Sequence, residues 1–263
     1  MENSFCAELT NFKTLYNVLK SITLKEYAII CIMNEGVKVT IEEMKCAETT
    51  AYIPVEVFAS YTLKSQEDIK FKLSLKILTE CLHIYEDETN HSLKMTYRGS
   101  GFPLCLLIKH NEEDVTIDCQ IQTMDVDDNM HLLSDECTLY KVIFYANRFL
   151  DILMDLDSTS DDLELLLSPN PPYFRMSTSS TSGESVITIS KDSELMIVFE
   201  CENEFTSKYS FNYIKQIFKA MHFANKVSIL INEYGLLGIQ LLIDENDKKL
   251  YVEHRIMPMF TED

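Results

Sequence analysis

The chain of 263 residues has no tryptophan, only six glycines and six prolines, and no long apolar run. Its longest apolar segments, such as residues 28–33 and 104–108, are far shorter than the roughly 20 residues that a membrane-spanning helix needs. No basic stretch followed by an apolar one opens the sequence, so no secretory signal is predicted. We therefore expect a soluble intracellular protein without a membrane partner.

Positive charge is also scarce, because 23 Lys and Arg face 42 Asp and Glu and give a net charge of −19. This balance argues against nucleic-acid binding over the whole surface, since neutralising phosphates requires Lys and Arg. The composition, 46% hydrophobic and 25% charged, is typical of a globular protein. A local basic surface remains compatible with the net charge, so the distribution of charge along the chain decides the matter.

Motifs that carry catalysis or bind metals are missing. The sequence has no phosphate-binding loop, no G-x-S-x-G nucleophile motif, and no histidine or cysteine spacing typical of zinc sites. The pair Asp161 and Asp162 suggests a metal-dependent 3′→5′ exonuclease, but it lies in a polar, loop-like stretch where solvated charges are common. We therefore predict no enzyme, no catalytic residue, no metal and no cofactor, and keep the exonuclease as a less favoured alternative.

The same order of strands and helices is predicted twice along the chain. Each half is predicted to open with a strand and a helix and to carry further strands, a second helix and a closing hairpin. Residues 101–124 and 235–258 align without gaps at an offset of 134 and predict that hairpin in both halves. The acidic segment 125–136 has little strand signal. We predict two similar domains, 1–124 and 137–263, joined by a connector at 125–136.

The predicted helices span residues 11–22, 74–84, 146–157 and 212–222. The predicted strands are 5–9, 27–33, 37–42, 46–53, 55–63 and 69–73 in the first half, and 139–144, 163–167, 173–178, 185–190, 195–200 and 208–211 in the second.

Positive charge is concentrated on the four predicted helices. They hold six basic and four acidic residues, a net charge of +2, whereas the rest of the chain has a net charge of −21. Lysines on any solvated helix would produce the same pattern. A plan in which both helices of a domain pack on one face of the sheets also permits a common basic face.

A duplicated domain with two helices per copy and an acidic connector resembles the PCNA-like sliding clamps. The stretches 36–42, 45–47, 168–178, 191–196 and 251–253 are similar to the Rad-One-type subunits of the heterotrimeric checkpoint clamp, the nine-one-one complex. The segments Ser179–Glu184 and Arg255–Met257 depart from the family's pattern. The resemblance implies an α+β, PCNA-like sliding-clamp fold of two similar domains, each with two helices packed on one face of antiparallel sheets.

The resemblance also implies a function. Such a chain would be a non-catalytic, nuclear subunit of a ring formed with two homologous clamp subunits. A clamp loader would place the ring around double-stranded DNA at damage sites, where it would recruit checkpoint and repair proteins. A homotrimeric replicative processivity clamp is the alternative within the same superfamily.

Particular residues follow from the resemblance. The DNA-facing residues implied are Lys13, Lys20, Lys76, Arg148, Lys215 and Lys219. The subunit edges implied are strands 115–123 and 185–190, with apolar contacts from Val115, Ile117, Cys119, Ile121, Val186, Ile187 and Ile189. A partner groove beside the connector would be formed by Met44, Leu132, Leu133 and Met257; the alternative is that the two leucines only hold the connector in place.

Overall fold

A computed structural model describes residues 3–43, 45–83, 91–110, 115–126, 138–181, 183–245 and 248–259. The chain divides into two compact units. Unit 1 comprises Met1–Glu42, Thr50–His131 and Asp244–Tyr251; unit 2 comprises Glu43–Thr49, Leu132–Ile243 and Val252–Asp263. The predicted domain boundaries at the connector fall largely on residues outside the described ranges and stay a prediction.

Unit 1 has two antiparallel sheets and two helices. One sheet has the order β5-β1-β7-β8-β9 and the other the order β10-β6-β2-β3-β4. The helices are α1 (Lys13–Ser21) and α2 (Leu75–His83). The strands are β1 (Phe5–Leu9), β2 (Tyr27–Met33), β3 (Gly36–Glu43), β4 (Ala47–Pro54), β5 (Ser60–Leu63), β6 (Ile69–Ser74), β7 (His91–Tyr97), β8 (Leu104–His110), β9 (Val115–Ile121) and β10 (Thr123–Met124).

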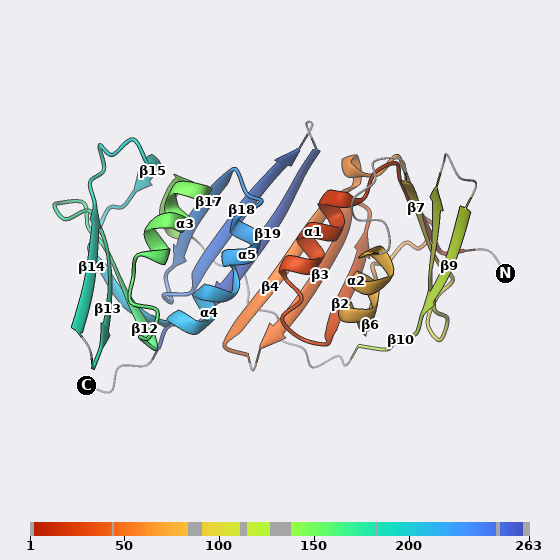
Figure 1. Cartoon of the computed structure of the whole chain (residues 1–263), viewed down its shortest axis with the longest axis horizontal. Helices are drawn as coiled ribbons and strands as arrows, with labels where there is room; N and C mark the ends of the chain where they lie inside the picture. Colours follow the sequence, from red (N-terminus) through yellow and green to blue (C-terminus); the bar gives the residue numbers. More distant parts are fainter. Residues whose placement is uncertain are drawn as a thin grey trace. The chain divides into compact units, whose positions relative to one another are not determined.

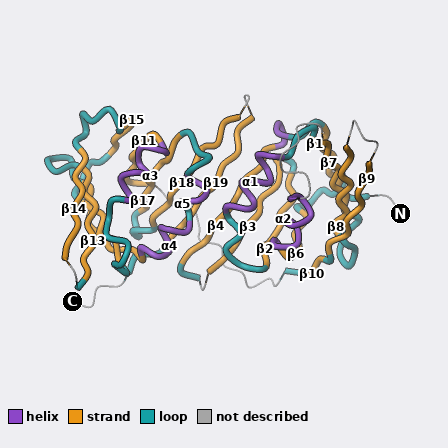
Figure 2. Tube along the Cα trace, viewed as in Figure 1, coloured by secondary structure: helices purple, strands orange, loops and turns teal. Residues whose placement is uncertain are grey.

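The two helices of unit 1 lie next to each other on one side of β2, β3 and β6 (Figures 1 and 2). Leucines spaced four apart on each helix, Leu15 and Leu19 on α1 and Leu78 and Leu82 on α2, line one apolar core, as amphipathic helices do. At the start of α2 the Ser74 hydroxyl accepts a hydrogen bond from the backbone N–H of Ile77 at 3.3 Å, which caps the helix.

Unit 2 repeats this plan. Its sheets have the orders β15-β11-β17-β18-β19 and β14-β13-β12-β16. The helices are α3 (Ala146–Met154), α4 (Phe211–Gln216) and α5 (Phe218–Met221). The strands are β11 (Thr138–Tyr145), β12 (Asp162–Leu167), β13 (Phe174–Ser180), β14 (Gly183–Ile189), β15 (Met196–Glu200), β16 (Phe205–Ser210), β17 (Lys226–Asn232), β18 (Leu237–Glu245) and β19 (Lys248–Ile256).

The two units share the same order of strands in their sheets. The series β5-β1-β7-β8-β9 corresponds to β15-β11-β17-β18-β19, and β6-β2-β3-β4 corresponds to β16-β12-β13-β14. The α+β class and the two similar halves predicted from the sequence are therefore confirmed. Among the described residues, no helix has the length and apolar character needed to cross a membrane.

The gapless offset of 134 between the two hairpins is wrong by one residue at β8 and β18. The buried rows of these strands are Leu104, Leu106 and Ile108 in β8, and Leu237, Ile239 and Leu241 in β18, which match at an offset of 133. A slip of one residue moves every side chain to the other face of a strand, so the burial pattern decides the offset.

Two predicted elements differ in detail. The helix predicted at 212–222 is split, because the Ile217 N–H bonds to the Ile214 carbonyl at 3.2 Å in a tight three-residue turn between α4 and α5. The strand predicted at 55–63 begins with a 3-10 turn at Val55–Val57, and only Ser60–Leu63 is extended in the sheet. β7 was not delimited from the sequence.

Candidate functional site

The basic residues predicted to face DNA lie on solvent-exposed helix faces in unit 1. Lys13 and Lys20 of α1 and Lys76 of α2 are exposed. The two helices are tied together by the Tyr16 hydroxyl, which lies 2.8 Å from His83 Nδ1 while the two rings stack at 5.6 Å. Lys20 Nζ lies 5.0 Å above the Tyr16 ring, a cation–π contact that keeps its charge on the α1–α2 face.

The basic helix residues of unit 2 differ from one another in exposure. Arg148 of α3 and Lys219 of α5 are exposed, but Lys215 of α4 is half-buried. Its Nζ donates a hydrogen bond to the Ser158 carbonyl at 3.0 Å and lies 4.9 Å from the centre of the Phe211 ring. Lys215 is therefore held by its own unit and is less available to an outside phosphate than the other five.

With the observed helix bounds, the difference in net charge between the helices and the rest of the chain is larger than predicted. α1 to α5 contain six basic residues and two acidic ones, Glu80 and Asp151, a net charge of +4, which leaves −23 for the rest of the chain. The two aspartates at 155 and 157 lie beyond the end of α3. Hydrogen bonds from Ser180 and Thr159, with a smaller contribution from the Lys215 charge, hold the pKa of Asp157 below its ordinary value.

Each unit ends a sheet with an exposed strand. β9 is the outermost strand beside β8, and β14 is the outermost strand beside β13, within the described part of the chain. Val115 is 38% exposed and Val186 is 52% exposed, which leaves apolar surface on both edges. Backbone groups on the open side of such strands are free to pair with another chain.

The seven predicted interface residues divide into two groups. Val115, Val186, Ile117, Cys119 and Ile187 are exposed or partly exposed. Ile121 and Ile189 are 3% and 4% exposed, and their side chains belong to the cores of their own units. On β14, Ile187 and Ile189 lie opposite buried Met176 and Phe174, whereas Val186 lies on the other face.

Of the predicted groove residues, Met44, Leu132 and Leu133 lie outside the described residues. Met257 is 39% exposed, and its backbone N–H bonds to the Cys46 carbonyl at 2.8 Å. The Met259 N–H bonds to the Lys208 carbonyl at 2.8 Å, so the segment after β19 is held by two backbone contacts within unit 2.

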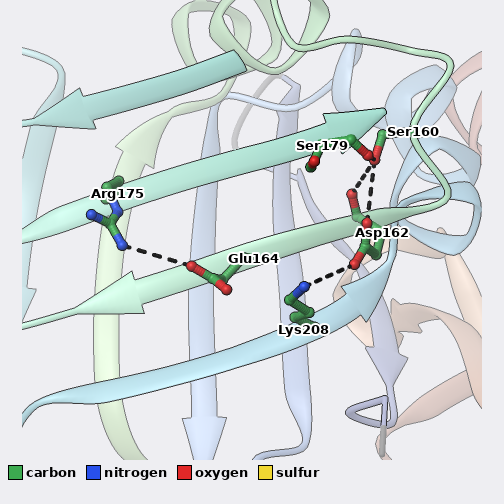
Figure 3. Close-up of polar contacts among 6 residues, drawn as sticks. All are labelled: Ser160, Asp162, Glu164, Arg175, Ser179 and Lys208. Atoms are coloured by element: carbon green, nitrogen blue, oxygen red, sulfur yellow. Dashed lines mark hydrogen bonds and ion pairs between the residues drawn. The ribbon is translucent and has the colours of Figure 1, made fainter. Parts of the chain in front are cut away.

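The sheet that contains β14 carries two ion pairs on one face (Figure 3). Arg175 of β13 lies 3.7 Å from Glu164 of β12, and Lys208 of β16 lies 3.3 Å from Asp162 of β12. Ser160 Oγ also donates to the Asp162 side chain at 3.3 Å. Asp162 is thus held in a structural network, and no group of three or more metal-binding side chains occurs within the described ranges.

The comparisons with known proteins indicate one family. The model of the repair protein family Rad1/Rec1/Rad17 matches residues 4–243. The cell cycle checkpoint protein RAD1 of Homo sapiens is 32% identical over 263 aligned residues, which cover 97% of this chain and 92% of that protein. The chain belongs to the Rad1/Rec1/Rad17 family.

More distant relatives span the same length. The DNA repair protein Rad1 of Drosophila melanogaster is 28% identical, with 98% of this chain and 95% of that protein covered. The DNA damage checkpoint control protein rad1 of Schizosaccharomyces pombe is 23% identical, with 97% and 86% covered. The Rad1 family has the PCNA-like clamp fold, which agrees with the duplicated strand order described above.

One polar cluster of this Rad1-family chain was not predicted. In unit 2, Arg255 of β19 lies 3.7 Å from Glu48 of β4 and 2.7 Å from Glu253, and the side chains of Arg255 and Glu48 are only 13% and 5% exposed. Beside them, the Thr49 hydroxyl donates to His254 Nδ1 at 2.6 Å, while His254 Nε2 donates to the Tyr213 carbonyl at 2.9 Å. The carbonyl can only accept, which fixes the proton on Nε2.

Burial lowers the pKa of His254 to about 4, so this imidazole is neutral at physiological pH. No local sequence signal indicated this cluster, because Thr49 and His254 are 205 residues apart.

Proposed function

We propose that this Rad1-family chain is a non-catalytic subunit of a heterotrimeric, ring-shaped DNA clamp. Two homologous clamp subunits would complete the ring through β9 and β14. A clamp loader would place it around double-stranded DNA at damage sites in the nucleus, where it would recruit checkpoint and repair proteins. The proposal includes domains 1–124 and 137–263 joined by a connector at 125–136, with a partner groove near Met257.

The observation that carries the proposal is the separation of charge. A net charge of +4 on the helices of a protein whose remaining residues total −23 is the pattern expected where only one surface meets DNA. A ring holds the duplex topologically, so these Lys and Arg side chains need only make non-specific phosphate contacts. The names of the relatives, which refer to cell cycle checkpoint and DNA damage control, support this function.

The test uses the ring assembled with its two related subunits and loaded on circular DNA. We expect the triple variant Lys13→Glu, Lys76→Glu, Arg148→Glu to assemble normally and to be lost from DNA at lower salt. Three missing phosphate contacts should reduce the slope of log retention against log salt by about three. Lys215→Glu alone should have the smallest effect of the helix reversals, because Lys215 is held by Ser158.

The matched control reverses three exposed lysines that are not on helices, Lys109, Lys191 and Lys249. If this control loses DNA as readily as the helix variant, the assignment of the inner surface is wrong. A stable trimer of the chain alone would favour the homotrimeric clamp instead. Magnesium-dependent digestion that is lost in Asp162→Asn would favour the exonuclease.

A further inference from the structure

Two neighbouring strand segments in unit 2 show how this protein closes a strand edge. Residues 47–49 of β4 and 252–256 of β19 belong to this unit, and Arg255 joins Glu48 across them at 3.7 Å. Both side chains are nearly buried. The second amino group of Arg255 lies 2.7 Å from Glu253 Oε2, so the guanidinium is shared by two carboxylates. Glu48 is thus tolerated at a closed edge because a neighbouring strand supplies a base.

Strand β14 holds the place of β4 in the second half of the fold. Both strands follow the third strand in the series β6-β2-β3-β4 and β16-β12-β13-β14. Both carry a buried isoleucine at or next to their last residue, Ile53 at 1% exposure and Ile189 at 4%. A glutamate stands five residues before each isoleucine, Glu48 in β4 and Glu184 in β14. Glu184 is therefore the counterpart of Glu48.

The environment of Glu184 lacks the base that Glu48 has. Glu184 is exposed and forms no ion pair with any described residue. The only two basic residues on the four strands of its sheet are Arg175 and Lys208, and both are paired with carboxylates of β12 (Figure 3). No basic side chain on the described strands of its own sheet is left to pair with Glu184.

A second copy of this chain could not supply that base from its own edge. β9, with the sequence VTIDCQI, contains no Lys or Arg and carries the acidic Asp118. A joint between β14 and the β9 of another copy would enclose Glu184 without a compensating charge. A carboxylate left unpaired as water is excluded is strongly unfavourable, which opposes a joint of this kind.

We propose that β14 selects its neighbour by charge: Glu184 receives an arginine or lysine from the edge strand of a different polypeptide, as Glu48 receives Arg255 within unit 2. The inference rests on the proposed function, because it takes β14 to be a joint of the ring. It identifies the chemistry of one partner, a clamp subunit whose edge strand is basic, and it predicts that the chain does not close a ring with itself.

The first experiment measures assembly with the two related clamp subunits. Glu184→Arg should weaken the complex at least tenfold, since like charges then meet across the joint. The control Glu233→Arg makes the same charge change in an exposed turn of unit 2 and should assemble like the wild type. If the ring forms and Glu184→Arg assembles equally well, the inference is overturned while the proposed function stands. If the wild-type subunits form no complex, both are overturned.

The second experiment asks whether a basic β9 permits self-association. The chain alone should be monomeric at micromolar concentration in sedimentation velocity. The double variant Asp118→Lys, Gln120→Arg should self-associate, and adding Glu184→Arg should remove that association. Circular dichroism checks that each variant folds, as expected for exposed positions. Self-association that persists after Glu184→Arg is added counts against the inference. So does a double variant that does not self-associate.

Discussion

Strands β4 and β14 hold the same place in a duplicated fold, but their side chains meet different surroundings. The Glu48 side chain is 5% exposed and contacts Arg255, whereas its counterpart Glu184 is exposed and has no described ion pair. The apolar residues follow the same contrast, since Val186 on β14 is 52% exposed. The difference shows that burial of an edge strand depends on its neighbour, and that β14 has no neighbour on its outer side within the described part of the chain.

Of the changes that test this comparison, the replacement of Arg255 should have the largest effect. We expect Arg255→Ala to lower the free energy of unfolding by about 3–5 kcal/mol, because it removes the guanidinium that is shared by the 5% exposed Glu48 and the 21% exposed Glu253. Arg175→Ala, which removes an ion pair of similar length whose side chains are 37% and 30% exposed, should cost about 0–1 kcal/mol. Urea unfolding of both variants measures the difference. Equal losses would mean that burial does not distinguish the two pairs.

His254, which precedes Arg255 in β19, should make the free energy of unfolding depend on pH. Burial lowers its pKa from 6.5 in the unfolded chain to about 4 in the folded protein. Below pH 6.5 the unfolded chain takes up a proton that the folded protein does not, so stability present above pH 6.5 falls as the pH decreases. The loss from this group reaches about 3 kcal/mol by pH 4.

Other carboxylates also titrate in this range, so the measurement is a difference between wild type and His254→Gln. Urea unfolding at pH 7, 6, 5 and 4 should show a steeper loss in the wild type, because glutamine has no proton to gain. Parallel pH profiles would show that His254 is not held neutral in unit 2.

The sequence predicted most elements because their signals are local. Leucines at helical spacing predicted α1 and α2 within two residues of their observed ends, and runs of strand-forming residues predicted β2 and β3. The break at Ile217 was not predicted, because isoleucine suits the buried face of a continuous helix as well as it suits the turn. The hairpin offset was wrong by one because composition alone does not reveal which face of a strand is buried.

The site could be predicted only in part, for a related reason. The exposed Lys13, Lys76 and Arg148 follow from helical periodicity, which places them opposite the buried leucines. The position of Lys215 depends on Ser158, 57 residues away in the sequence. The ion pair of Arg255 depends on Glu48 in a distant strand. Contacts of this kind have no local pattern, so only the fold reveals them.

Hydrogen exchange of the free chain and of the assembled ring tests most directly whether β14 and β9 are the joints. On assembly, the outward amides within Gly183–Ile189 and Val115–Ile121 should exchange at least about tenfold more slowly, because backbone pairing protects them. The amides of residues 47–49 in β4 should keep the rate they have in the free chain, since residues 252–256 of β19 already lie beside them within unit 2. Unchanged exchange in both β9 and β14 in a ring that has formed would contradict the account.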